Sequence, residues 1–146
     1  MVAKIRGLDD VLKTFRQLPI STQNKATGPA LRAGANVVKK AAIDNVKSEV
    51  STESTGILAK SIRVYSLKKI RGNLRMGVMI KKGAVNPKKT DRNGPVRVGL
   101  YGSVLEYRPG KSWLRKAARD RTTEVLNVVE KESLARIDAA VKDAQK

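Results

Sequence analysis

The spacing of apolar residues changes in the middle of the chain, and this change limits the possible folds more than any other feature. Apolar residues recur at every third or fourth position between residues 30 and 46, whereas they alternate with polar residues from about residue 60. The first spacing is typical of one face of a helix, and the second of a strand with one buried face. A helical spacing returns after Ser112, which can cap this last helix. The sequence therefore predicts an α+β fold with an N-terminal helix, a long alanine-rich helix, a small antiparallel β-sheet of about three to four strands, and a long C-terminal helix.

Two helices are predicted in the first third of the chain. The segment from Leu8 to Leu18 carries apolar residues three and four positions apart, and Pro19 is expected to end this helix. Ser21 can cap a second, longer helix, in which Gly28-Pro29 either causes a kink or marks the true start. The apolar face beyond this point consists of small residues, so another element can approach closely. We expect that element to come from the same chain, and a neighbouring copy is the alternative.

A β-hairpin is predicted after a polar, turn-forming segment at residues 48–56. A strand is expected from about residue 60 to 69, a turn at Arg71-Gly72-Asn73, and a second strand from Leu74 to Lys82. Residues 2–6 also alternate between apolar and basic side chains, which predicts a short strand or an ordered arm.

The segment after the hairpin is less regular. Residues 83–94 have no periodicity and contain several glycines, prolines and charged residues, so a long exposed loop is expected. Val96, Val98 and Leu100 are then expected to form a third strand. Residues 101–107 are short and apolar, and they are compatible with either a helical turn or an extension of that strand.

The chain contains neither cysteine nor histidine. Disulfides and thiolate metal sites are therefore excluded, and the commonest metal ligand and proton shuttle is missing, so we expect no metal and no cofactor. No apolar run approaches the ~20 residues needed to cross a membrane, and the N-terminal segment lacks the apolar core of a signal peptide. We expect a single domain over residues 1–146 that is cytosolic where it is made.

Positive charge is the strongest compositional signal. The chain has 31 basic and 13 acidic side chains, which give a formal net charge of +18. Residues 51–110 alone hold thirteen basic and three acidic side chains, so a contact with a polyanion is expected to centre there. A basic surface that only keeps the protein soluble is the alternative. The candidate contact residues are Lys68, Lys69, Arg71, Lys81, Lys82, Lys88, Lys89 and Arg92.

The remaining composition narrows the function further. The chain has one Phe, one Trp and three Tyr, so aromatic platforms for stacking single-stranded bases are scarce. Any bound nucleic acid is therefore expected to be duplex and to be bound without sequence preference. Glu106, flanked by Leu105 and Tyr107, is the one carboxylate that could act as a buried base. We expect it to form an ion pair with an arginine instead, and we expect the chain not to be an enzyme.

Three segments, in their order along the chain, resemble a known family. Residues 55–62 read Thr-Gly-x-Leu-x-x-Ser-Ile, residues 101–107 read Tyr-small-x-x-x-Glu-aromatic, and residues 113–117 read aromatic-Leu-Arg-x-Ala. With the order of the predicted elements, they make the chain similar to the tail-completion, or neck, proteins of long-tailed bacteriophages, often called tail components. The motif residues are Thr55, Gly56, Leu58, Ser61, Ile62, Tyr101, Glu106, Tyr107, Trp113 and Leu114.

This resemblance implies a structural virion protein, assembled in the host bacterial cytoplasm, that forms a ring between head and tail through which the genome passes. A homo-oligomeric ring, with six copies favoured, would contact neighbouring neck, connector and tail-terminator or tail-tube proteins. It would also make non-specific contacts with genomic duplex DNA, and its basic residues would face either the channel or an adjacent ring. The alternatives are a non-specific duplex DNA-binding protein and a tail terminator at the head-proximal end of the tail.

The resemblance also implies roles within residues 55–62. Thr55-Gly56 would make a turn, and Leu58 and Ile62 would anchor the following strand to the long helix. Lys60 and Arg63 would face outwards.

Overall fold

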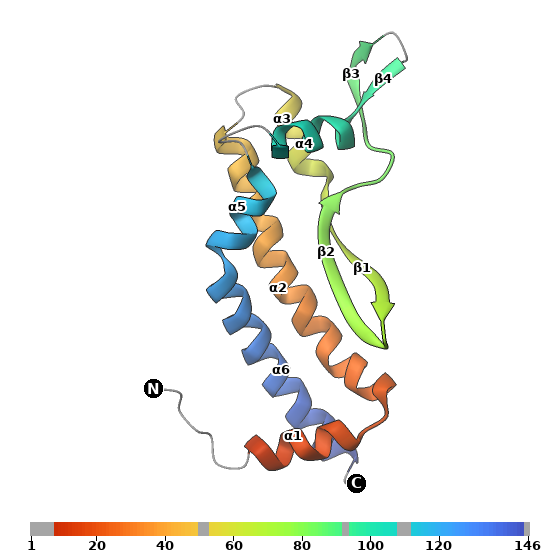
Figure 1. Ribbon diagram of the computed structural model, residues 1–146, viewed down its shortest axis with the longest axis vertical. Coiled ribbons are helices and arrows are strands. Elements are labelled where there is room, and N and C mark those ends of the chain that lie inside the picture. Colours follow the sequence, from red (N-terminus) through yellow and green to blue (C-terminus); the bar gives the residue numbers. More distant parts are fainter. Residues whose placement is uncertain (1–7, 50–52, 92–93, 108–111, 145–146) are drawn as a thin grey trace.

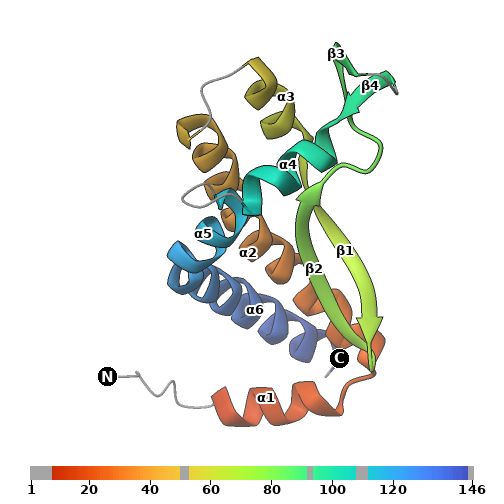
Figure 2. The same cartoon turned by 45° about the horizontal axis from the view of Figure 1, so that its top comes forward.

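The long helix α2, from Ile20 to Glu49, is the centre of the molecule. A computed structural model describes residues 8–49, 53–91, 94–107 and 112–144. A two-stranded ribbon lies along one side of α2, and the C-terminal helix α6 runs antiparallel to α2 on another side (Figures 1 and 2). The predicted α+β class is confirmed. The elements are α1 (Leu8–Gln17), α2 (Ile20–Glu49), α3 (Glu53–Ser61), β1 (Ile62–Ile70), β2 (Asn73–Ile80), β3 (Val85–Asp91), β4 (Gly94–Arg97), α4 (Val98–Tyr107), α5 (Trp113–Asp120) and α6 (Thr122–Ala144).

The junction between α1 and α2 differs from the prediction in its details. The first helix ends before Pro19, as predicted, but α2 begins at Ile20, so Ser21 lies in the first turn and is not the cap. The Pro19 carbonyl accepts hydrogen bonds from the backbone amides of Thr22 and Gln23. The Gln23 side-chain amide donates to the Leu18 carbonyl at 2.7 Å. Pro29 lies inside α2, so it does not mark the start of the helix.

The small-residue face of α2 packs against α6. A Cβ atom at Gly34 would lie 2.5 Å from Val129 Cγ2 and 3.2 Å from Val125 Cγ1, so only glycine permits this close approach of the two helices. The expectation of an intramolecular partner for this face is confirmed. The last predicted helix is interrupted at Arg121 and forms two elements, α5 and α6.

The ribbon β1–β2 is an antiparallel hairpin closed by a two-residue turn. Ile70 pairs with Asn73, and the turn residues Arg71 and Gly72 have φ angles of 50° and 80°. Positive φ at both positions is the geometry of a type I′ turn, whose twist matches that of the two strands. The Asn24 side-chain amide donates to the Gly72 carbonyl at 3.4 Å, so the turn lies beside the N-terminal part of α2.

The segment before this ribbon corrects one prediction. Residues 53–61 form helix α3, so Thr55-Gly56 lies in a helix and not in a turn, and the strand begins only at Ile62. The Ser61 hydroxyl donates to the Ile57 carbonyl at 2.7 Å, one helical turn earlier, where α3 ends. Leu58 and Ala59 of this helix are buried in the core, and this burial outweighs the local turn signal.

Most of the described residues between 83 and 94 form strands and not the predicted irregular loop. Gly83, with a φ angle of 76°, lies in the connection to β3, which pairs with β4 in a second short hairpin. In the described residues, the four strands therefore make two separate two-stranded ribbons and not one sheet. Of the predicted third strand, Val96 lies in β4, but this strand ends at Arg97, and Val98 and Leu100 lie in α4 together with residues 101–107. The predicted strand or arm at residues 2–6 lies outside the described residues.

The core is small and mainly aliphatic, and it consists of two clusters. The larger one centres on Val46, Leu58, Ile62 and Trp113, where α2, α3, β1 and α5 meet. The smaller one joins the ends of the helices through Phe15, Ala26, Ile137 and Val141. Within the described residues, no helix is long and apolar enough to cross a membrane.

Candidate functional site

The three motif segments meet at one corner of the molecule, between α3, α4 and α5. Gly102 of α4 is buried there, and a Cβ atom at this position would collide with Ile80 Cδ1 and lie 3.1 Å from Leu58 Cδ1. The buried Trp113 indole donates from Nε1 to the Gly102 carbonyl at 3.0 Å. The small residue after Tyr101 in the motif therefore allows α4 to pack against both the ribbon and α3. We call this corner the joint.

Glu106 holds the start of α5 in the joint. Its carboxylate accepts hydrogen bonds from the backbone amides of Leu114 at 2.8 Å and Arg115 at 3.0 Å, and it forms an ion pair with the Arg115 guanidinium at 3.0 Å. A carboxylate that accepts from the second and third amides acts as an N-terminal cap and is favoured by the helix dipole. The expected Glu106–arginine ion pair is confirmed. The Ser112 side chain makes no capping hydrogen bond, so that predicted cap is wrong.

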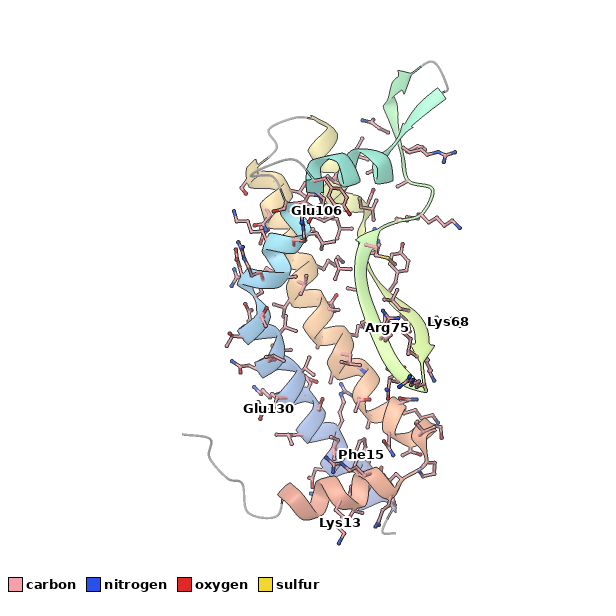
Figure 3. The ribbon with its side chains drawn as sticks, viewed as in Figure 1. Lys13, Phe15, Lys68, Arg75, Glu106 and Glu130 are labelled. Carbon is pink, nitrogen blue, oxygen red and sulfur yellow. The ribbon has the colours of Figure 1, made fainter. Side chains whose placement is uncertain are left out.

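The remaining motif residues surround this cap. Leu58 and Ile62 are fully buried, which confirms their anchoring role, and Lys60 and Arg63 are exposed as expected. Tyr107 is 79% exposed, and the Arg115 guanidinium carbon lies 5.5 Å from the centre of its ring. Figure 3 shows Glu106 among the side chains at this end of the helices. The side chains of Thr55 and Tyr101 lie outside the described residues.

Residues 60–82, which we call the basic ribbon, carry positive charge only. They contain eight cations and no carboxylate, and all eight side chains are exposed. No carboxylate in the described part of the chain forms an ion pair with any of them. Like charges at this density repel one another and attract anions from outside. The eight cations are Lys60, Arg63, Lys68, Lys69, Arg71, Arg75, Lys81 and Lys82.

The two faces of the ribbon have different roles. Side chains at directly paired positions lie on the same face, so Val64 and Val78 share one face, while Arg63 and Met79 share the other. Val78 and Ile80 pack against the core, so the first of these is the inner face. The outer face carries Arg63, Tyr65, Leu67, Arg75, Gly77 and Met79.

The predicted contact residues lie at the two ends of the basic ribbon. Lys68, Lys69 and Arg71 are at the turn beside the start of α2, and Lys81-Lys82 follow β2 at the other end. Figure 3 shows Lys68 and Arg75 on the ribbon, which lies across α2 from α6. Lys88-Lys89 lie in β3 but their side chains are outside the described residues, as is the whole of Arg92. Sequence reasoning missed Arg75, because its place on the outer face depends on the register of the hairpin.

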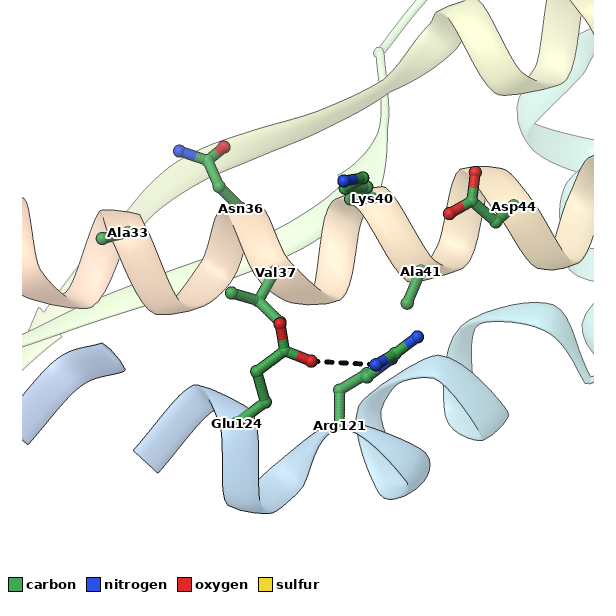
Figure 4. A pocket seen from close by; sticks show the side chains of 8 residues that line it. All are labelled: Ala33, Asn36, Val37, Lys40, Ala41, Asp44, Arg121 and Glu124. Carbon is green, nitrogen blue, oxygen red and sulfur yellow. Dashed lines mark hydrogen bonds and ion pairs between the residues drawn. The ribbon is translucent and has the colours of Figure 1, made fainter. Parts of the chain in front are cut away.

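Two surface grooves complete the candidate sites. The first has a volume of about 440 Å³ and lies between α2 and the start of α6, where Glu124 is held by Arg121 at 3.0 Å (Figure 4). The second, of about 450 Å³, is a mainly apolar groove beside the joint that includes Met79 and Tyr107. Among the described residues, no group of three or more carboxylates could hold a metal ion.

A comparison with protein families identifies the family of the chain. The model of the family described as "Bacteriophage HK97-gp10, putative tail-component" matches residues 9–107, about two thirds of the chain. No curated protein and no solved structure shows a significant match. The matched region runs from α1 to the end of α4 and includes the basic ribbon and the first two motif segments. The chain therefore belongs to the HK97-gp10-like family of bacteriophage tail components.

Proposed function

We propose that the protein forms a homo-oligomeric ring, with six copies favoured, at the head–tail interface of a tailed bacteriophage. The ring joins the head to the tail tube, contacts the neighbouring neck, connector and tail-terminator or tail-tube proteins, and lets the DNA pass. It is a structural part of the virion and has no catalytic role.

The basic ribbon is the observation that carries this proposal. Its eight exposed cations contribute no ion pair to the fold of the described chain, so their charge is available to an external partner. A duplex genome moving through a ring is a polyanion that must be contacted without sequence preference, and lysines suit this because they act as mobile point charges. The lysines at both ends of the ribbon are the residues that we assign to this contact.

Electron microscopy of particles made without the protein tests the proposal. We expect filled heads and separate tails that fail to join, with joining restored when the gene is supplied in trans. Normal joined particles in the absence of the protein would contradict the proposed position and leave only a minor role in the tail.

A charge-matched pair of variants tests the DNA contact. One variant changes Lys68, Lys69, Lys81 and Lys82 to Gln, and we expect it to lower DNA retention or the yield of infectious particles. The control changes the same number of exposed lysines elsewhere and therefore has the same net charge. Equal effects of both variants would assign the ribbon charge to solubility. The control residues are Lys13, Lys25, Lys47 and Lys131.

A non-specific duplex DNA-binding protein is the second candidate, and the same ribbon favours it. The major groove admits a two-stranded ribbon, and an isolated monomer would then bind with an affinity that falls steeply as salt rises. A gel-shift series in rising salt separates the two functions. Tight binding by the monomer at low salt supports the second candidate, whereas a monomer that ignores duplex DNA excludes it.

A further inference from the structure

We propose that the outer face of the basic ribbon of one copy docks against the outer face of α6 of the next copy. This inference rests on the proposed ring and names the two surfaces that build it. A ring of identical subunits needs two different faces that fit one another, because each subunit uses one face toward each neighbour. The ribbon and α6 lie on different sides of α2 in both views, so they can serve as these two faces (Figures 1 and 2).

The outer face of the ribbon has the composition of a protein interface. Its centre combines Arg63, Tyr65, Arg75 and Met79, and Met79 is 43% exposed. Arg, Tyr and Met are enriched at the centres of interfaces, whereas Lys is depleted there and found at the rim. The lysines of the ribbon follow this rule, because they lie at its two ends.

Gly77 has no side chain, so the middle of the outer face is open to the side chain of Leu67. It pairs with Tyr65, and a Cβ atom at Gly77 would lie 3.0 Å from Leu67 Cδ1, so Leu67 leans across the glycine. The result is an apolar surface between two arginines. Phosphate groups would gain nothing from Tyr65, Leu67 and Met79, so a protein is the better partner for the centre of the face, and the lysines at its ends remain available to DNA.

The outer face of α6 supplies the complementary groups. Leu126 is 63% exposed, and Glu130 lies one turn further along, so the two side chains are neighbours on the helix surface. Glu130 has no ion-pair partner in the described part of the chain, unlike most carboxylates of α6. Figure 3 shows Glu130 on the side of α6 away from the ribbon. Leu126 can meet the apolar centre of the ribbon, and Glu130 can pair with an arginine of the next copy.

The absence of cysteine from the chain makes a direct test possible. Purified particles would carry Met79→Cys, Leu126→Cys, or both, and would be treated with a short bifunctional thiol cross-linker. The double variant should give a ladder of covalent oligomers, whose longest member reports the number of copies in the ring. Each single variant should give no covalent oligomers, because every interface between two copies then carries only one thiol and a cross-link needs two. Cross-linked dimers from Met79→Cys alone, or no ladder from the double variant, would overturn the proposed pairing.

A charge reversal gives a second, independent measurement. Arg75→Glu and Glu130→Arg, each alone, should weaken the association between copies of the protein by about tenfold or more, because like charges then face each other across the interface. The double reversal should recover most of the lost association. Both positions are exposed, and an unchanged circular dichroism melt verifies the fold of each variant. No recovery in the double variant, with all three folded, would contradict the Arg75–Glu130 pairing.

These outcomes are distinct from a failure of the proposed function. If rings are present in the particle but neither test responds, the ring uses other faces and only this inference falls. If the protein is missing from the head–tail interface, the proposed function falls whichever surfaces associate.

Discussion

The basic ribbon and the C-terminal helix pair handle charge in opposite ways. Residues 113–144, which span α5 and α6, contain seven cations and six carboxylates, and four ion pairs form among them. Residues 60–82 contain eight cations, no carboxylate and no ion pair to any described residue. The helices balance their charge within the chain, while the cations of the ribbon stay without an ion pair in the described part of the chain.

This difference bears on stability, because only the helices compensate their charge within the described chain. Surface ion pairs such as those on α6 contribute little stability each, about 0–1 kcal/mol, but they keep a long exposed helix from repelling itself. An unbalanced ribbon gives the fold no such benefit, and its self-repulsion costs stability. The joint connects the two regions, so changes there, in the ribbon and in the helices should have effects of different size and sign.

The largest effect is expected at the joint, where the ribbon meets the helices. Gly102→Ala places a methyl group against Ile80 and Leu58, and overpacking of this kind costs about 1–3 kcal/mol of unfolding free energy. Gly99→Ala, in the same helix, meets no atom within 4 Å and is the matched control, which should be neutral or stabilising. Urea denaturation of both variants measures the difference, and equal stabilities would show that the joint is not tightly packed.

The next largest effect is expected at the cap of α5. Glu106→Ala removes the acceptor for the Leu114 and Arg115 amides and should cost about 1–2 kcal/mol. Glu106→Gln keeps an acceptor oxygen and should therefore lose less stability than Glu106→Ala. Particle assembly should follow the measured stability in both variants. A Glu106→Gln protein that is fully stable but inactive would instead indicate a chemical role for this carboxylate.

A smaller and more diagnostic pair of variants compares the two regions directly. Glu132→Gln breaks the ion pair with Arg136 and should lower stability by about 0.3–0.5 kcal/mol. Lys68→Gln combined with Lys69→Gln removes two unpaired charges and should leave stability unchanged or raise it, with the rise largest at low salt. Thermal melts at two salt concentrations test this contrast. A loss of stability from the lysine changes would mean that the ribbon charges do support the fold.

The smallest effect is expected from the pH dependence of the last helix. The hydrogen bond and charge of Asp138 raise the pKa of Lys142 above the ordinary value of a lysine. A raised lysine pKa stabilises the folded state below the ordinary pKa, and this contribution is lost as the pH rises through the raised value. At neutral pH, Lys142→Gln should therefore have a slightly lower free energy of unfolding than the unchanged protein. This difference in stability should vanish in strongly alkaline solution. A difference that grows with pH would contradict the assigned ion pair.

Much of the fold follows from local pattern, but the joint does not. Apolar spacing predicted α1 and the hairpin, because each depends on neighbours close in sequence. The burial of Leu58 and Ile62 was expected only from the family resemblance. Thr55-Gly56 has the residues of a turn, yet tertiary burial of Leu58 makes the segment helical. The role of Gly102 depends on Ile80 and Trp113, which belong to other elements and are brought next to Gly102 only by the fold.

The candidate site was predictable to a similar degree. An excess of basic residues in the middle of the chain is visible from composition alone. An ion pair of Glu106 with an arginine was expected, but its partner, Arg115, is identified only by the structure. The outer face of the ribbon is not, because strand register decides that Arg63, Arg75 and Met79 lie together. The ion pairs Glu132–Arg136 and Asp138–Lys142 of α6, by contrast, follow from sequence spacing once the segment is taken as a helix, because residues four apart are neighbours on its surface.

A cryo-electron microscopy reconstruction of the head–tail region of intact particles tests the central claim most directly. The ribbon charge is expected to serve a ring in the virion, so the map should contain this fold repeated around a cyclic axis, with the basic ribbon of every copy covered by a neighbour or facing the DNA. A particle whose head–tail region lacks the fold, or a ring whose ribbons all face open solvent, would contradict the account.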